Sequence, residues 1–221
     1  MITPVGGLMQ HEQNGPRGHQ PDQLSDQPQS QDGRTLRRLN SFDRAIDALL
    51  DLIESGNSSP TAQQIAEKSG ISVRTVFRLT EDIEQLHAAA VHRQVIRTSH
   101  LYVHLPVSGS LSARIRALIE NRATVFEAIA ATRRVADRLA ETSPQIAEAL
   151  DFHHQLLRAQ VAQLFDRELS RISRVRRADA LSAVDVAAGW ETWDHLRRIQ
   201  GLSITSSGRV VRLLIEGVLA K

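Results

Sequence analysis

Apolar residues recur at intervals of three and four along most of the chain after residue 40, the spacing that places them on one face of an α-helix. Five of these positions define the buried face of a predicted first helix: Phe42, Ala45, Ile46, Leu49 and Ile53. Asn40 or Ser41 is suited to capping the start of this helix, and Gly56 follows its end. No stretch shows the alternation that a strand needs, so the predicted fold class is all-α.

A pair of short helices is predicted next. Thr61 and Gln64, three residues later, match the pattern of a capping box, which begins a helix at Thr61. Gly70 ends that helix in a turn, and Ser72 is suited to capping a third helix over 73–79. Two short helices joined by a glycine-containing turn form a helix-turn-helix.

About five or six further helices are expected in the rest of the chain. Thr80 is suited to capping the first of them, which runs from near Asp82 to His104 and stops before Pro106. The others are expected from Ser110 or Ser112 through Arg138 (either continuous or broken near Thr132), from Pro144 to about Ser170, over 177–200 and, after a break at Gly201, over 205–219.

The first 33 residues have a different composition. Residues 11–33 are rich in Gln, Asp, Pro, Ser and Gly, so ordering them would bury too little apolar surface to offset the lost entropy. We therefore expect residues 1–33 to form a disordered tail. Arg34, Arg37 and Arg38 follow as a basic cluster, which resembles the arms that enter a DNA minor groove beside a recognition helix; a charged flank of the first helix is an equally good interpretation.

The overall composition excludes several classes of protein. Hydrophobic residues make up 41% of the 221 positions, enough for a buried core, and the formal net charge of +2 does not by itself indicate nucleic-acid binding. There is no cysteine, which rules out disulfides, thiol catalysis and thiolate metal ligands. The N-terminus has no signal-peptide pattern, and no apolar run approaches the roughly 20 residues of a membrane span, so we expect a cytoplasmic protein with no membrane partner.

The sequence contains no pattern typical of catalysis. It has no glycine-rich phosphate loop and no nucleophile elbow. His153, His154 and His195 invite a metal site, but adjacent histidines point to different faces of a helix, and no partner ligand stands at a known spacing. We expect no metal, no cofactor and no enzymatic activity.

The segment 61–86 carries the clearest functional signal. Its small and apolar positions allow the two short helices to cross closely: Ile65, Ala66, Ile71 and Val76. The second helix presents five residues outward, where they could enter a DNA major groove: Ser72, Val73, Arg74, Phe77 and Arg78. Arg74 and Arg78 lie four residues apart on one face, and the alternative to DNA contact is that they are solvated surface charges.

This segment resembles the N-terminal signature of the TetR family of transcriptional regulators. The matching positions are Thr61, Ile65-Ala66, Ser69-Gly70-Ile71-Ser72, Thr75-Val76-Phe77 and Leu86, and the resemblance spans about residues 34–100. Phe77 stands where the family has a phosphate-contacting tyrosine, Thr80 where it has a phenylalanine, and Ile83 where it has a lysine. The residues implied to contact DNA are Arg38, Thr61, Gln63, Ser72, Val73, Arg74, Thr75, Phe77 and Arg78.

Residues 178–221 are similar to the closing helix pair of many TetR members, especially in Trp190-Glu-Thr-Trp193 and Leu196-Arg-Arg. In that family the pair packs against its copy in a second subunit as a four-helix bundle. A homodimer is therefore implied, with interface residues Leu181, Val184, Ala188, Leu213 and Val218. Trp190 and Trp193 are expected in the core of the domain or of the dimer.

The resemblance implies a helix-turn-helix DNA-binding domain over 34–83 and a helical effector-binding and dimerisation domain over 84–221. It also implies a repressor whose dimer binds a palindromic operator in double-stranded DNA and is released by a small-molecule effector. The segments 101–104, 115–126 and 152–165 are expected to line the effector pocket. Two alternatives remain: a helical ligand-binding or scaffolding dimer whose DNA contacts have decayed, and another class of helix-turn-helix regulator, such as a sigma-factor-like module.

Overall fold

The computed structural model describes residues 29–79 and 83–219, and all regular structure within these ranges is helical. The N-terminal helices are α1 (Gln29–Glu54), α2 (Ala62–Ser69), α3 (Val73–Leu79) and α4 (Ile83–Thr98), followed by the short 3₁₀ turn η1 (Ser99–Leu101). The remaining elements are α5 (Leu111–Leu139), α6 (Pro144–Leu164), α7 (Asp166–Leu169), α8 (Arg174–Ala187), α9 (Trp190–Asp194), the π-helical turn η2 (His195–Ile199) and α10 (Ile204–Leu219). The all-α fold class predicted from the sequence is confirmed.

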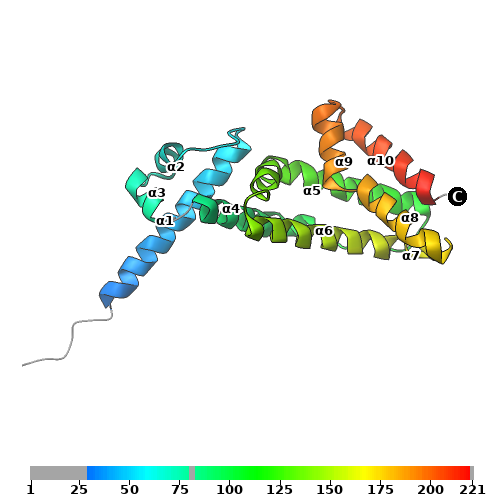
Figure 1. The fold of residues 1–221 in the computed structure, drawn as a ribbon, viewed down its shortest axis with the longest axis horizontal. Coiled ribbons are helices and arrows are strands. Elements are labelled where there is room, and N and C mark those ends of the chain that lie inside the picture. Colours follow the sequence, from blue (N-terminus) through cyan, green and yellow to red (C-terminus); the bar gives the residue numbers. More distant parts are fainter. Residues whose placement is uncertain (1–28, 80–82, 220–221) are drawn as a thin grey trace, which may run out of the picture.

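The helices follow one another along the long axis of the molecule, as Figure 1 shows. The three helices α1, α2 and α3 lie at one end, and α7, α8 and α10 lie toward the other end, near the C-terminus. Between them, α4 packs against α1 on one side and against α5 on the other. The long helices α5 and α6 pack against each other, so they connect the two ends of the fold.

The unit formed by α2 and α3 has the predicted caps. The Gln64 N–H donates to Thr61 Oγ1 at 3.3 Å and the Thr61 N–H donates to Gln64 Oε1 at 2.9 Å, which completes the capping box. Gly70 ends α2 in the left-handed conformation, with φ of 67°. Ser72 Oγ accepts a hydrogen bond from the Thr75 N–H at 3.1 Å at the start of α3. These local signals therefore predict both helices correctly.

An apolar cluster holds the three N-terminal helices together. On α1 and α2–α3 its buried members are Ala45, Ile46, Ala48, Leu49, Leu50, Ile53, Ile65, Ala66 and Val76, with Phe42 packed at the edge. The cluster is completed by Leu86 and Ala90 of α4 and by Val135 of α5. In addition, Arg138 Nη2 donates to the Ser58 carbonyl at 2.9 Å. The helix-turn-helix is therefore packed directly against the C-terminal helices.

A second apolar cluster fills the C-terminal part of the fold. It contains the aromatic residues Phe126, Phe165, Trp190 and Trp193, so the two tryptophans lie in the core of the chain itself. Arg114 at the start of α5 is buried beside this cluster and makes a two-pronged ion pair with Glu168 of α7, with N–O distances of 2.9 and 2.5 Å. This pair fixes the start of α5 against the end of the α6–α7 segment.

The start of α1 differs from the prediction. The helix begins at Gln29, well before Asn40 or Ser41. Ser41 lies inside the helix, where its Oγ donates to the Arg37 carbonyl at 2.9 Å. Residues 29–33 of the predicted disordered tail therefore belong to a helix, whereas residues 1–28 and the predicted cap Thr80 lie outside the described residues.

The segment between α4 and α5 also corrects a prediction. The helix α4 ends at Thr98 and not at His104, because the chain tightens there into η1 before it reaches Pro106. Ser110 then caps α5 as predicted, its Oγ accepting a hydrogen bond from the Ala113 N–H at 3.2 Å. The helix α5 is continuous through the buried Thr132.

Two predicted long helices are each divided. The one that begins at Pro144 is interrupted at Phe165, which separates α6 from α7. The one predicted over 177–200 is interrupted at Gly189, which separates α8 from α9. A Cβ atom at Gly189 would lie 3.1 Å from the Asp185 carbonyl oxygen, so the chain turns here at a point where glycine relieves a close approach. The apolar periodicity of the sequence continues across both breaks, so it does not indicate them.

We expect Gly70→Ala to destabilise the fold by about 1–2 kcal/mol, because a left-handed conformation is costly for a residue with a Cβ. The added Cβ would also lie 2.8 Å from Arg44 Nη2, the group that donates to the Ser69 carbonyl. Thermal and urea unfolding measure the change. The control is Gly33→Ala on α1, where a Cβ lies 3.7 Å from Arg37 Nη2, an ordinary contact, and helix propensity predicts a gain of up to about 1 kcal/mol. Equal unfolding temperatures for Gly70→Ala and the wild type would contradict this account of the turn.

Candidate functional site

The helix α3 presents a mixed polar and apolar face to solvent. Val73 is 39% exposed and Phe77 is 65% exposed. Arg74 and Arg78 are exposed beside them, and neither forms an ion pair with a described residue. This face therefore combines two guanidinium groups that have no acidic partner among the described residues with two accessible apolar side chains.

The predicted contact residues around α3 lie mostly on the surface as well. Thr61 and Gln63 are exposed at the start of α2, where Gln63 Nε2 donates to Glu67 Oε1 at 3.1 Å. Ser72 is exposed, and its Oγ lies 2.7 Å from the hydroxyl of the half-buried Thr75. The structure therefore brings these residues together along the start of α2 and the outer face of α3.

The basic cluster of Arg34, Arg37 and Arg38 lies on the N-terminal half of α1. All three side chains are exposed, and Arg37 Nε donates to the Gly33 carbonyl at 3.0 Å. Figure 1 shows this half of α1 projecting beyond α2 and α3. The cluster is therefore carried by the helix α1.

Arg93 of α4 is a residue that the sequence interpretation missed. Its guanidinium donates to Asp47 Oδ1 at 3.1 Å and also bonds Asp43, both on α1. The partners are distant in sequence, so no local pattern indicates the contact. Arg93 links the helix that follows the helix-turn-helix directly to the helix that supports it.

A groove of about 920 Å³ lies between α4 and α6. Its lining is largely apolar and comes from both helices and from the segment that follows α4: Gln85, Ala88, Ala89, Val91, His92, Val95, Ser99, Tyr102, Gln145, Ile146, Ala149, Phe152, His153 and Leu156. The predicted lining segments 101–104 and 152–165 contribute Tyr102, Phe152, His153 and Leu156, whereas 115–126 contributes nothing to this groove. The wall formed by α4 was not predicted.

Burial and nearby positive charge change the pKa values of residues near the groove. Burial, together with Arg133 and Arg122, lowers the pKa of His153 to about 4, so the imidazole is neutral near pH 7. Its ring packs edge-on against Tyr102, with 5.2 Å between ring centroids. Burial also raises the pKa of Tyr102 and lowers that of Arg122 to about 10. His153 and Tyr102 are therefore neutral within the groove, while the guanidinium groups of Arg122 and Arg133 lie near them.

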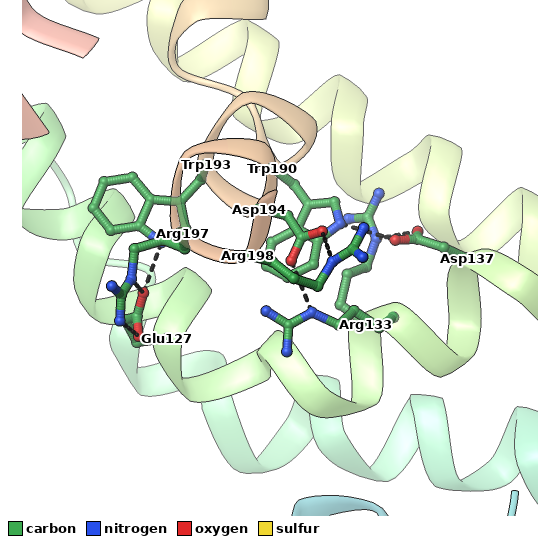
Figure 2. A network of polar contacts seen from close by, with 9 residues as sticks. Glu127, Arg133, Asp137, Trp190, Trp193, Asp194, Arg197 and Arg198 are labelled. Carbon is green, nitrogen blue, oxygen red and sulfur yellow. Dashed lines mark hydrogen bonds and ion pairs between the residues drawn. The ribbon is translucent and has the colours of Figure 1, made fainter. Parts of the chain in front are cut away.

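The motif Trp190–Trp193 is held by acidic residues of α5, as Figure 2 shows. Trp190 Nε1 donates to Asp137 Oδ2 and Trp193 Nε1 donates to Glu127 Oε1, each at 2.8 Å. Arg197 also binds Glu127, with Nε 2.8 Å from Oε1. Both indole N–H groups therefore have hydrogen-bond partners at the edge of the core, and these contacts give the motif a structural role.

Asp194 extends the same network. It accepts hydrogen bonds from Arg134 of α5 at 2.7 Å and from Arg198 at 3.0 Å. Burial raises the pKa of Asp194, but the bonds from these two guanidinium groups outweigh burial and leave it below its ordinary value. The network fastens α9 and η2 to α5.

The residues predicted for a dimer interface occupy different environments. Val184 and Ala188 are buried within the chain's own core, so they do not lie on its free surface. Leu181 and Val218 are half-buried, and Leu213 is 68% exposed. Of the predicted set, Leu213 is the one whose side chain is mostly available to another molecule.

Among the described residues no three His, Cys, Asp or Glu side chains are grouped so that they could hold a metal ion. Within the same ranges no helix has the length and apolar character needed to cross a membrane.

We expect Glu127→Gln to reduce the acid sensitivity of the fold. The Arg197 hydrogen bond, aided by Trp193, lowers the pKa of Glu127 below its ordinary value of about 4.3. A lowered folded-state pKa means that the carboxylate contributes stability above pH 4.3 and loses that contribution as the pH falls through the lowered value. The variant should therefore be less stable than wild type at pH 7 and lose less stability between about pH 5 and pH 3.

Urea unfolding at a series of pH values measures this difference. The control is Glu141→Gln, because Glu141 is exposed and makes no ion pair with a described residue. An equal loss of stability on acidification in wild type and Glu127→Gln would contradict the role assigned to this carboxylate.

Comparison with known proteins finds a similar fold in the crystal structure of a transcriptional regulator from Rhodococcus sp. Rha1. The two chains superpose with a TM-score of 0.62 at 16% sequence identity, over 81% of this chain and 96% of the other. No protein-family model matches the chain, and no curated protein does. The chain has the helical fold of that transcriptional regulator.

Proposed function

We propose that the chain is a one-component transcriptional regulator of the TetR type, which binds double-stranded DNA through α3. The observation that carries this proposal is the exposed face of α3, where Arg74 and Arg78 stand beside Val73 and Phe77 on a capped helix-turn-helix. Guanidinium groups bind phosphates and guanine edges, and apolar side chains contact the methyl group of thymine. The fold shared with the Rhodococcus regulator supports the same function.

The two arginines have different positions on α3 and therefore different proposed roles. Recognition helices place their N-terminal residues against base edges. Arg74 and Val73 begin α3, so we assign them to base contacts, whereas Arg78 lies one turn later and is assigned to the phosphate backbone. The exposed Arg38 on α1 adds a further phosphate contact, which offsets the missing hydroxyl of Phe77.

A palindromic operator requires two copies of α3, about 34–36 Å apart. The helices α8 and α10 pack against each other and expose Val186, Leu213 and Leu214. We propose that this surface forms the C2 homodimer, with Leu181 and Val218 at its margin. Val184 and Ala188 then support the interface from the core of each protomer.

The groove between α4 and α6 is the proposed site of a small-molecule effector. Because α4 lines the groove and Arg93 on the same helix binds Asp43 and Asp47 of α1, a change in the α4 position moves the helix-turn-helix. The dimer is proposed to have two forms, one with the α3 separation that fits the operator and one without it. An effector that binds the second form more tightly releases the operator and ends repression. Its effect equals its difference in affinity for the two forms.

The DNA-binding proposal is tested with Arg74→Ala and Arg78→Ala in gel-shift and anisotropy titrations at several salt concentrations. Arg74→Ala should cost about 1–3 kcal/mol on the operator and relax specificity at one base pair. Arg78→Ala should weaken binding to operator and random DNA alike. It should also reduce the slope of log K against log salt concentration by about one for each site. The operator is sought in the intergenic DNA beside the gene.

The control is Arg116→Ala, which removes an exposed arginine from α5, far from α3. Its DNA affinity should equal that of wild type. If both α3 variants bind operator as tightly as wild type, α3 does not read DNA. If the wild type itself binds neither the neighbouring DNA nor random DNA, a helical ligand-binding dimer replaces the proposed regulator.

The dimer is tested with Leu213→Asp, which places a charge in the centre of the proposed interface. We expect wild type to have the mass of a dimer at micromolar concentration and Leu213→Asp to shift toward the monomer, because burying an unpaired carboxylate is costly. Light scattering coupled to size-exclusion chromatography measures the mass. Leu36→Asp on α1 changes a similarly exposed leucine elsewhere and should leave the dimer intact. A monomeric wild type, or a dimer that survives Leu213→Asp, contradicts this interface.

A further inference from the structure

A small inner chamber adjoins the groove between α4 and α6. It has a volume of about 50 Å³ and shares five lining residues with the groove: Val91, Val95, Tyr102, Ala149 and His153. Its other lining residues are Gln94 and Thr98 of α4, Ile129, Thr132, Arg133 and Ala136 of α5, and Leu150 of α6. The groove is thus wide and apolar at the surface and narrow at its inner end, where it meets three helices.

Three polar atoms around this chamber lack a hydrogen-bond partner among the described residues. They are Gln94 Oε1, Thr132 Oγ1 and His153 Nε2. Gln94 is 6% exposed and Thr132 is 4% exposed, so solvent does not satisfy them. Buried polar groups nearly always have a partner, and leaving one unpaired costs about 1–3 kcal/mol. Three such atoms around one chamber indicate a place for a polar group from another molecule.

The hydrogen bonds around the chamber determine what these atoms can accept. A threonine inside a helix commonly donates to the carbonyl four residues earlier. For Thr132 that carbonyl belongs to Ala128, and it accepts a hydrogen bond from Gln94 Nε2 at 3.3 Å instead. This contact directs the amide nitrogen of Gln94 to the backbone and leaves its oxygen free. Gln94 therefore offers an acceptor, and the Thr132 hydroxyl offers either a donor or an acceptor.

The charge around the chamber selects against a cationic head group, and the hydrogen-bonding atoms select against an anionic one. Arg133 lines it, with its guanidinium bound to Asp137 at 2.7 Å and Glu191 at 3.3 Å, and the buried Arg122 lies close enough to His153 to repel its protonated form. This positive surrounding disfavours an ammonium group. The free oxygen of Gln94 requires a donor, which a carboxylate does not have. A hydroxyl group meets both conditions, because it is neutral and both donates and accepts.

We propose that the groove binds a neutral ligand with an apolar body and a hydroxyl head, of the class of medium-chain alcohols and alkylphenols. The hydroxyl enters the inner chamber, donates to Gln94 Oε1 and accepts from the Thr132 hydroxyl, while the apolar body lies between α4 and α6. A groove of about 920 Å³ is of the size that holds small organic ligands. This inference rests on the effector site of the proposed function and specifies the chemistry of its ligand.

The test uses probes that share a hydrocarbon body and differ in the head group: octan-1-ol, octanoate and octylammonium, with 4-propylphenol as a second hydroxyl-bearing body. Isothermal titration calorimetry on the full chain measures each affinity. We expect octan-1-ol or 4-propylphenol to bind, and the two ionic probes to bind at least about tenfold more weakly, because an unpaired or mismatched buried charge costs more than a neutral hydrogen bond.

Thr132→Val tests the chamber directly, because valine has nearly the same shape and no hydroxyl. The variant should bind the hydroxyl probe about 3- to 10-fold more weakly, the effect of one lost hydrogen bond. Without ligand, it should melt about 2–4 °C higher than wild type, because an unpaired buried hydroxyl has been removed. The control is Thr124→Val on the same helix, where the exposed hydroxyl donates to the Glu120 carbonyl at 2.9 Å; this change should leave the probe affinity unaltered.

The inference is overturned if neither hydroxyl probe binds, if an ionic probe binds as tightly as its alcohol, or if Thr132→Val binds the alcohol as well as wild type does. A gel shift with the same samples separates this inference from the proposed function. Wild type that binds DNA but no hydroxyl probe refutes the ligand chemistry and leaves DNA binding standing. Wild type that binds the alcohol through Thr132 but binds no DNA supports the ligand chemistry and refutes the regulator.

Discussion

The buried contact of α1 with α4 and α5 is the constraint on which the rest of the structure depends. Leu86 and Ala90 of α4 and Val135 of α5 complete the apolar cluster that α1, α2 and α3 begin. A three-helix unit of about fifty residues has a small core of its own, because short chains bury a low fraction of their surface. The C-terminal helices therefore stabilise the helix-turn-helix, and the position of α3 relative to α8 and α10 is set by packed helices.

Two buried arginines of α5 bind groups on the α6–α7 segment. Arg114 pairs with Glu168 of α7, while Arg122 donates to the Gln160 side chain at 2.8 Å and to the Leu157 carbonyl at 3.2 Å on α6. A buried ion pair adds little net stability compared with apolar residues of the same size, but removing one partner is costly. These contacts fix the register of α5 against α6 and α7, because a slip of α5 by one turn would leave buried guanidinium groups without acceptors.

The sequence predicts those parts of the fold that are determined within a few residues. The caps at Thr61 and Ser72 act over three positions, so α2 and α3 are predicted almost to the residue. The start of α1 at Gln29 and the break at Gly189 lack such a local signal. For the candidate site, the amphipathic pattern identifies apolar faces but not what covers them. Val184 is therefore predicted at an interface and found in the core, and the α4 wall of the groove is missed.

In the proposed mechanism, α4 converts ligand binding into a change at α3, and the energies involved are modest. A hundredfold loss of DNA affinity requires a difference of about 2.8 kcal/mol between ligand affinities for the two forms. Burying one methylene group contributes about 0.8 kcal/mol, so three or four methylenes that contact α4 in one form only are sufficient. Ala88 and Ala89 on the groove face of α4 leave its backbone close to any occupant. With so little side chain to adjust, a ligand thicker than the groove displaces α4 itself, and the ion pairs of Arg93 carry that displacement to α1.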